Sequence, residues 1–256
     1  MRTAHHVLNP RTPPQIARGL CALAIMTKVP RAGDVKTRLV PPLTYDEAAE
    51  LNTSFLRDTA ASIRAAAGDN AQCIGVYTPL GIEHTYSEIL PLDFVLVPQR
   101  GDTFGERLYF AALDLFACGF GSICLIDSDS PTIPAETFSR AVKLLQDAKD
   151  RVVLGPSDDG GYYLIGFKKL HGGMFDQIEW STERVLGQTV RRAKEIGLKV
   201  KMLPRGYDVD DRAGLQRLCT ELLGENSPLD FGIAPYTREF LSRIIKREGR
   251  ARIWPA

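Results

Sequence analysis

Short apolar runs alternate with longer amphipathic stretches along most of this chain. Runs rich in β-branched and other apolar residues, bounded by polar or glycine-containing segments, predict buried strands. Such runs cover residues 21–27, 72–77, 94–98, 122–126, 152–155, 162–167 and 198–203. Helical patterns separate most of them, which favours a largely parallel sheet over an antiparallel one.

The longer stretches carry apolar residues at three- and four-residue spacing, as Leu108, Ala111, Ala112 and Leu115 do. Pro134 stands where a first helical turn would begin, and Gly197 where a helix would end. The predicted helices cover residues 45–67, 104–118, 134–148 and 181–196, a segment starting at Asp210, and residues near 237–247. The pattern predicts a three-layer α/β/α fold around a mostly parallel sheet.

The 256 residues suffice for one large α/β domain. Residues 1–20 are polar and contain Pro10, Pro13 and Pro14, so we expect a flexible leader. The catalytic domain should then cover residues 21–224. A helical extension over residues 225–256 should pack on it, either as a cap or as a dimer contact, and this choice stays open.

Charge and composition exclude several classes of function. Lys and Arg total 32 against 31 Asp and Glu, so no overall field recruits a nucleic-acid polymer or an anionic membrane. No apolar run is long enough to span a bilayer, and we expect a cytoplasmic protein. The five cysteines are scattered without a C-x-x-C pair, which predicts reduced core thiols. The four dispersed histidines disfavour a Ser-His-Asp hydrolase.

A basic segment follows the first predicted strand, at the edge of the sheet where α/β proteins bind ligands. Gly33 permits unusual backbone geometry, while Lys36 and Arg38 supply a point charge and a bidentate fork that suit phosphate oxygens. The glycine spacing matches neither the P-loop nor the dinucleotide-binding pattern. A solvated basic loop is the alternative interpretation.

An acidic cluster, Asp127-Ser128-Asp129, follows the predicted strand 122–126. Mg²⁺ is usually held by one or two carboxylates together with substrate phosphates, and this tripeptide supplies that minimum. Capping of the next helix is the competing interpretation. Asp129 is expected to be the more direct metal ligand of the two.

A second cluster, Asp158-Asp159-Gly160-Gly161, lies about thirty residues further on. The paired glycines would let the backbone approach a ligand closely, and Asp159 would orient a hydroxyl, accept a proton or join a metal shell. An Asp-Gly hairpin turn between two strands explains the same residues, and both interpretations are compatible.

Three other segments contain candidate site residues, with weaker motifs. Asp210 or Asp211 is an ordinary helix cap or, for Asp210, a second metal carboxylate. Gly105 and Arg107 stand at a helix start that would face a nucleotide. Trp180 and Ser181 read first as a helix cap and second as part of an acceptor site.

Taken together and in this order, the motifs resemble a family of bacterial glycosyltransferase-like proteins of formerly unknown function, with a nucleotide-diphospho-sugar transferase (GT-A) fold. The resemblance covers residues 22–223. Its carriers are Lys28-x-Pro30-x-x-Gly33-x-Val35-Lys36-Thr37-Arg38-Leu39, Gly105-Glu106-Arg107, Asp127-Ser128-Asp129-Ser130-Pro131, Asp159-Gly160-Gly161-Tyr162-Tyr163-Leu164-Ile165-Gly166, Trp180-Ser181-Thr182 and Tyr207-Asp208-Val209-Asp210. The segment 36–39 is also similar to phospholactate and phosphoenolpyruvate guanylyltransferases.

The resemblance implies a role for each matching residue. Asp129 and Asp210 would hold Mg²⁺ or Mn²⁺, and Asp159 would face the reacting centre as the catalytic residue. Trp180 and Ser181 would lie on the acceptor side. Nucleotide and phosphate binding would fall to Lys28, Gly33, Lys36, Arg38, Gly105, Arg107, Asp127, Gly160 and Gly161. Family members more often have glycine at the position of Asp127.

The leading hypothesis is a metal-dependent glycosyltransferase that moves a sugar from a nucleoside diphosphate sugar to a small-molecule acceptor. The alternative is a nucleotidyltransferase that joins a nucleoside monophosphate to a small phosphorylated metabolite and releases pyrophosphate. Lys36 and Arg38 favour it slightly, but the chain lacks the glycine-rich loop that would cradle a triphosphate. A nucleotide-binding protein without catalysis is the third hypothesis.

Overall fold

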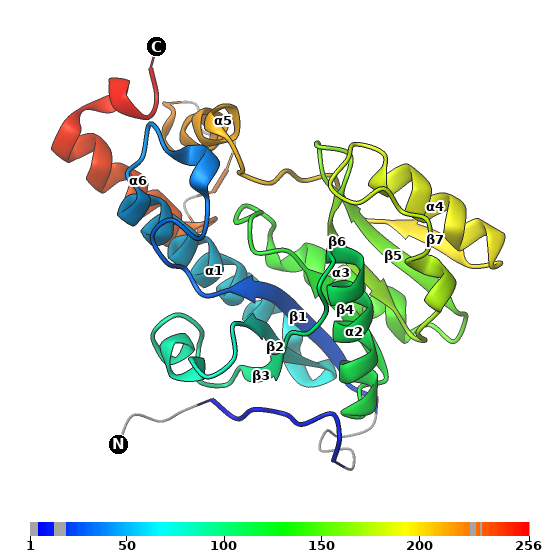
Figure 1. Ribbon diagram of the computed structural model, residues 1–256. Coiled ribbons are helices and arrows are strands. Elements are labelled where there is room, and N and C mark those ends of the chain that lie inside the picture. Colours follow the sequence, from blue (N-terminus) through cyan, green and yellow to red (C-terminus); the bar gives the residue numbers. More distant parts are fainter. Residues whose placement is uncertain (1–4, 13–18, 226–228, 231, 256) are drawn as a thin grey trace.

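The computed structural model describes residues 5–12, 19–225, 229–230 and 232–255. Its centre is a seven-stranded sheet with the order β3-β2-β1-β4-β6-β5-β7 (Figure 1). The strands are β1 (Cys21–Lys28), β2 (Ala71–Thr78), β3 (Val95–Pro98), β4 (Ser122–Ile126), β5 (Arg151–Pro156), β6 (Tyr162–Phe167) and β7 (Lys199–Met202). Only β6 among them runs against its neighbours, because a tight hairpin joins it to β5.

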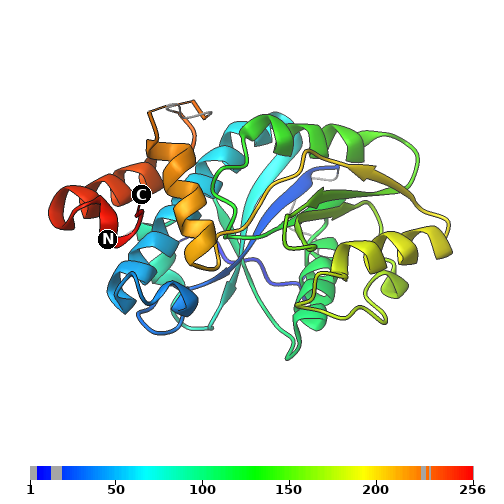
Figure 2. The same ribbon diagram turned by 90° about the horizontal axis from the view of Figure 1, so that it is seen from above.

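Helices cover both faces of the sheet (Figure 2). The main helices are α1 (Tyr45–Ala67), α2 (Phe104–Ala117), α3 (Ala135–Gln146), α4 (Val185–Glu195), α5 (Arg212–Leu223) and α6 (Pro235–Glu248). Apolar side chains of α1 and α3 pack on one face, and those of α2 and α4 on the other. The predicted three-layer, mostly parallel α/β/α fold is confirmed.

Local signals explain why α1 matches its predicted bounds. The Thr44 hydroxyl accepts a hydrogen bond from the Glu47 N–H at 3.2 Å, and the Glu47 carboxylate accepts one from the Thr44 N–H at 2.8 Å. Such a capping box satisfies two N–H groups that the first helical turn leaves unpaired. By contrast, α4 begins at Val185 and not at Ser181 as predicted, because Ser181 has a left-handed backbone (φ 63°) that ends any helical run there.

Part of the predicted leader lies against β3. Leu8 is buried, and its N–H donates to the carbonyl of Leu96. His5 is buried as well and hydrogen-bonds the carbonyls of Phe94 and Tyr86. Residues 1–4 and 13–18 of the predicted leader lie outside the described residues. All five cysteines are buried and free, as predicted.

The C-terminal helices form a third core on the outer side of α1. Apolar residues of α1, α5 and α6 meet there, together with Leu39, Tyr207 and Val209 from two loops at the edge of the sheet. The buried Asp58 carboxylate of α1 accepts hydrogen bonds from the N–H groups of Tyr236 and Thr237 at the start of α6. Helix α6 therefore packs on α1 in this structure.

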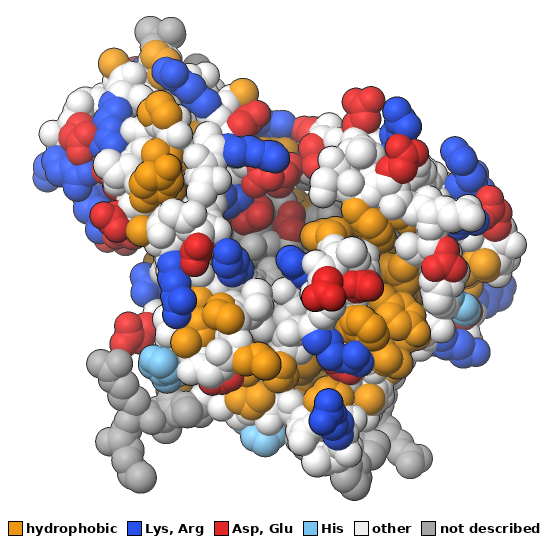
Figure 3. Space-filling model, viewed as in Figure 1, with side chains coloured by type: hydrophobic (Ala, Val, Ile, Leu, Met, Phe, Trp, Pro, Cys, Tyr) orange, Lys and Arg blue, Asp and Glu red, His pale blue; other side chains and the backbone are white. Residues whose placement is uncertain are grey.

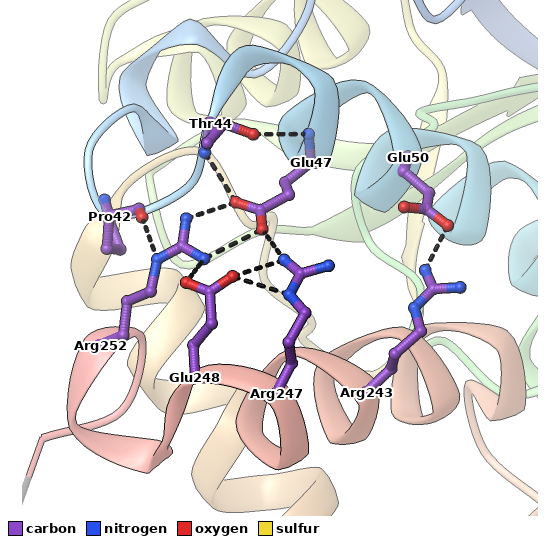
Figure 4. A network of polar contacts seen from close by, with 8 residues as sticks. All are labelled: Pro42, Thr44, Glu47, Glu50, Arg243, Arg247, Glu248 and Arg252. Carbon is purple, nitrogen blue, oxygen red and sulfur yellow. Dashed lines mark hydrogen bonds and ion pairs between the residues drawn. The ribbon is translucent and has the colours of Figure 1, made fainter.

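A group of ion pairs closes the same contact, and we call it the C-terminal clamp: Glu47, Arg247, Glu248 and Arg252 (Figure 4). Glu47 accepts hydrogen bonds from Arg252 Nη2 and Arg247 Nη2, each at 2.5 Å. Arg252 also donates to the carbonyl of Pro42 at 3.1 Å. The clamp thus joins the C-terminal segment to the loop that precedes α1.

Candidate functional site

Three loops meet at the carboxyl edge of the sheet, where open α/β sheets bind ligands. They follow β1, β4 and β7 and span residues 29–44, 127–134 and 203–211. The Val209 N–H donates to the Asp129 carbonyl at 3.0 Å, which ties the second loop to the third. Packing of Leu39 and Val209 in the third core holds the first loop beside them.

Lys36 lies at the centre of these loops. Its side chain is only 4% exposed, and its Nζ lies 2.8 Å from Asp129 Oδ1 and 2.8 Å from Asp210 Oδ1. The ammonium also donates to the Val209 carbonyl at 2.9 Å. A left-handed backbone (φ 49°) at Lys36 turns the chain into the short 3₁₀ turn Thr37–Leu39. Burial alone would lower the pKa of Lys36, but Asp129 and Asp210 raise its pKa above the ordinary 10.5.

Asp129 and Asp210 provide the oxygen ligands that Mg²⁺ and Mn²⁺ prefer. Their side chains are 33% and 47% exposed, and their contacts within the described residues all fall on the Oδ1 atoms. Across the described part of the chain, no group of three or more His, Cys, Asp or Glu side chains is arranged to hold a metal ion. The two carboxylates therefore fit a cation that completes its shell with water and substrate phosphates.

Two further carboxylates, Asp127 and Asp208, belong to the same loops as this pair. Asp127 accepts a hydrogen bond from the Ser130 hydroxyl at 2.7 Å, and Asp208 accepts one from the Ser157 hydroxyl at 3.0 Å. Burial, followed by the charge of Asp129, raises the pKa of Asp127 well above 3.8. Burial and the neighbouring carboxylates also raise the pKa of Asp208. Asp127 precedes Asp129 by two residues and Asp208 precedes Asp210 by two, so the two loops carry the same Asp-x-Asp pattern.

Sequence reasoning assigned no role to two residues of this site. Asp208 repeats the Asp127-x-Asp129 spacing ahead of Asp210, and this repetition was the available signal. Asn52 lies on α1 and donates to Asp129 Oδ1 at 3.4 Å. Nothing in the helical pattern of α1 distinguishes Asn52 from an ordinary polar position, since its partner lies 77 residues away.

Two cavities open at this edge. One of about 300 Å³ is lined by Lys28, Val35, Lys36, Thr37, Arg38, Asn52, Ser128, Asp129 and Asp210. The other, of about 460 Å³, is lined by Arg38, Asp158, Asp159, Tyr207, Asp208, Asp210, Asp211, Ala213, Gly214 and Arg217. We call them the lysine cavity and the aspartate cavity. Arg38 and Asp210 line both, so the cavities are neighbours. Figure 3 shows a hollow with acidic and basic side chains between the α5–α6 side and the α4 side.

Asp159, Gly160 and Gly161 form the turn of the hairpin between β5 and β6, so the hairpin interpretation is confirmed. The Gly161 N–H donates to Asp159 Oδ1 at 2.8 Å and fixes that carboxylate beside the aspartate cavity. Gly160 has φ 87°, and a Cβ there would overlap the backbone of Glu183. The close backbone approach at Gly160 is therefore made to Glu183.

Asp210 and Asp211 precede α5, and only Asp211 is the helix cap that the sequence predicts for one of them. Asp211 caps α5, because its Oδ1 accepts a hydrogen bond from the Gly214 N–H at 2.8 Å. Asp210 contacts Lys36 and lines both cavities. Lys28 lines the lysine cavity and donates to the Asp34 carbonyl at 3.3 Å, whereas Gly33 is exposed with φ 82° and is not among the lining residues.

The remaining predicted residues lie apart from the lysine cavity. Trp180 packs on Gly105, where a Cβ would overlap its indole ring, and the two residues line a separate cavity of about 450 Å³. Arg107 donates to the carbonyls of Gly101 and Asp102 in the loop before α2. Ser181 is exposed beside Trp180. The structure thus joins the predicted nucleotide residue Gly105 with the predicted acceptor residue Trp180.

Solved structures with a similar fold agree with this architecture. A proposed nucleotide-diphospho-sugar transferase from Desulfovibrio desulfuricans G20 has a TM-score of 0.74 and 28% identity, covering 91% of this chain and 99% of its own. A cytidylyltransferase from Leptospira borgpetersenii serovar Hardjo-bovis has a TM-score of 0.53 and 12% identity, with coverages of 94% and 98%. The second likeness concerns the fold alone.

Among curated proteins none matches this chain. No helix within the described residues is both long and apolar enough to cross a membrane. Residues 60–182 match the model of the family described as "Uncharacterized protein conserved in bacteria (DUF2064)". The resemblance predicted from the motifs is therefore confirmed: residues 60–182 are similar to the DUF2064 family, and the chain has a nucleotide-diphospho-sugar transferase-like fold.

Proposed function

We propose that this protein is a metal-dependent glycosyltransferase that moves a sugar from a nucleoside diphosphate sugar to a small-molecule acceptor. One observation carries the proposal: loops far apart in sequence bring Lys36, Asp129 and Asp210 together at one cavity on the carboxyl edge of the sheet. The likeness of this chain's fold to that of a proposed nucleotide-diphospho-sugar transferase supports a nucleoside diphosphate sugar as the donor.

The lysine cavity would hold the diphosphate. Lys28, Lys36 and Arg38 line it and supply the positive charges that phosphate oxygens require. Asp129 and Asp210 would hold Mg²⁺ or Mn²⁺ at its wall. When bound, that ion stabilises the negative charge that develops on the departing diphosphate.

The aspartate cavity would receive the acceptor. It adjoins the lysine cavity at Arg38 and Asp210, so an acceptor there would lie next to the bond between the sugar and the diphosphate. Asp159 is our candidate to take the proton from the acceptor hydroxyl, because its carboxylate lines this cavity and the Gly161 N–H fixes its orientation.

Nucleotidyl transfer is the second candidate, and the three positive side chains of the lysine cavity favour it. In that reaction, a phosphate oxygen of the acceptor would attack the α-phosphate of a nucleoside triphosphate and displace pyrophosphate. Three cationic groups match the charge of a triphosphate at least as well as that of a diphosphate.

A thermal-shift panel separates these functions. Nucleoside diphosphates, diphosphate sugars and triphosphates are each tested with and without Mn²⁺, since a ligand of the native state raises its apparent stability. Stabilisation by a diphosphate sugar that requires Mn²⁺ supports glycosyl transfer, whereas preference for a triphosphate supports nucleotidyl transfer. Binding of nucleotides without turnover of any donor would identify a non-catalytic nucleotide-binding protein.

A further inference from the structure

Protein groups already engage the Lys36 ammonium in this structure, through hydrogen bonds to Asp210 Oδ1 and the Val209 carbonyl and an ion pair with Asp129. An ammonium group has three N–H donors. Three oxygens surround Lys36 Nζ at 2.8–2.9 Å: Asp129 Oδ1, Asp210 Oδ1 and the Val209 carbonyl. Its side chain is also 4% exposed, so a phosphate reaches the ammonium only after at least one of these contacts is released.

The same contacts place Lys36 in competition with a metal ion. Asp129 and Asp210 are the carboxylates assigned to the cation, and the lysine ammonium already neutralises part of their charge. A divalent cation held by these carboxylates would lie close to the positive charge of Lys36, whose side chain is itself shielded from solvent. A diphosphate removes this conflict, because its oxygens offer the ammonium a new partner and add negative charge.

We infer that Lys36 is a resident counter-ion which exchanges its carboxylate contacts for diphosphate contacts, and thereby couples diphosphate binding to metal binding. The inference rests on the proposed function of the site. In this scheme the metal binds weakly by itself, the diphosphate strengthens metal binding, and the metal strengthens diphosphate binding by the same factor. The enzyme is then loaded with metal and donor together.

The first test measures the affinity for Mn²⁺ alone, at pH 7.5, by electron paramagnetic resonance of the free ion. Lys36→Met should bind Mn²⁺ about tenfold more tightly than the wild type, because the competing charge is gone. Lys28→Met is the matched control. Lys28 lines the same cavity but contacts Asp34 and neither Asp129 nor Asp210, so its removal should leave Mn²⁺ affinity within about twofold.

A second measurement uses the wild-type protein and does not depend on how the variant folds. The ¹H–¹⁵N signal of the Lys36 ammonium should be protected from solvent exchange by burial, by its two hydrogen bonds and by its ion pair with Asp129. Addition of Mg²⁺ with methylene diphosphate should shift this signal. Addition of Mg²⁺ alone at the same concentration should leave most of it unchanged.

The outcomes separate this inference from the proposed function. If wild type binds Mn²⁺ and nucleoside diphosphate but Lys36→Met binds Mn²⁺ no more tightly, the coupling is wrong and the proposed function survives. If the Lys36 ammonium signal does not shift on addition of Mg²⁺ with methylene diphosphate, the coupling is likewise wrong and the proposed function survives. If neither protein binds Mn²⁺ at all, the metal-dependent function and this inference both fail.

Discussion

Two groups of ion pairs join distant parts of this chain, and they differ in which charge is buried. At the lysine cavity, the buried charge is the Lys36 ammonium, and its carboxylate partners are 33% and 47% exposed. In the C-terminal clamp, the buried charge is the Glu47 carboxylate, 10% exposed, and its arginine partners Arg252 and Arg247 are 22% and 56% exposed (Figure 4). Only the first group lines one of the two cavities at the sheet edge.

This difference separates a site from a structural contact. The guanidinium groups of Arg252 and Arg247 both engage Glu47, which therefore has its hydrogen-bonding capacity filled by protein. Asp129 and Asp210 share one ammonium and keep exposed surface toward solvent. Stability is expected to depend mainly on the clamp and ligand binding mainly on the lysine cavity, and the following variants test this division.

Asp129→Asn should have the largest effect, and it should fall on activity. Removing the charge of this carboxylate should lower metal-dependent turnover by about 100-fold or more. The free energy of unfolding should fall by less than about 2 kcal/mol, because Asp210 and the Val209 carbonyl still satisfy Lys36. Donor turnover and urea denaturation measure the two quantities. Undiminished turnover would show that Asp129 takes no part in the reaction. The control is Glu50→Gln, which neutralises an exposed carboxylate of α1.

Glu47→Gln should have the opposite effect to Asp129→Asn, a clear loss of stability with little loss of turnover. It removes a buried carboxylate that both caps α1 and binds two arginines, so the free energy of unfolding should fall by about 2 kcal/mol. Turnover of the folded fraction should change by less than about threefold, since no substrate contact is lost. A loss of turnover as large as that of Asp129→Asn, in protein that remains folded, would contradict the division between the two regions.

Acid should weaken the clamp over a defined range of pH. Burial opposes the charged form of Glu47, but hydrogen bonds from Arg252 and the Thr44 N–H lower its pKa from 4.5 to about 2. A lowered folded-state pKa gives stability that is complete above pH 4.5 and is lost as the pH falls toward 2. About 2 kcal/mol of the wild type's stability should be lost by pH 3 through this group. Denaturation at pH 6 and pH 3 should show this component in wild type and not in Glu47→Gln.

Arg252→Ala should have a smaller effect, a loss of about 1 kcal/mol, because Arg247 remains to pair with Glu47. Its matched control is Arg243→Ala. Arg243 of α6 pairs with Glu50 of α1, but both side chains are 52% exposed, and such pairs contribute little. Equal losses for the two arginine variants, measured by thermal denaturation, would show that the burial of Glu47 does not distinguish the clamp from a surface ion pair.

Much of the fold could be predicted because its signals are local. The bounds of α1 follow from Thr44, Glu47 and the glycine after the helix, all close to its ends. The strand bounds follow from compact apolar runs, and β4 and β6 match their predicted ranges. The order of strands around β6 was not predicted, since the pairing of β4 with β6 depends on side-chain packing between segments about forty residues apart.

In the candidate site, too, the position of a residue at a strand end could be predicted from local signals, but its spatial neighbours could not. Asp127, Asp129, Asp159, Lys36 and Arg38 could be located at strand ends from the apolar pattern, and the structure places them at the two neighbouring cavities or, for Asp127, on the same loop as Asp129. By motif, Gly105 and Arg107 were predicted to bind the nucleotide and Trp180 to lie on the acceptor side, and the structure places Gly105 and Trp180 together at a separate cavity. Motif order along the chain does not encode which strand ends are neighbours.

The sequence by itself determined which residue types stand at the carboxyl edge of the sheet, because alternation of strands and helices places every such loop on one side. Only the tertiary structure decided their partners. Lys36 meets Asp210 across 174 residues because α5 and α6 pack on α1 and hold the loops at Leu39 and Val209 together. That packing converts a basic loop and two acidic loops into one charged centre, since it brings their opposite charges to hydrogen-bonding distance in a largely buried place.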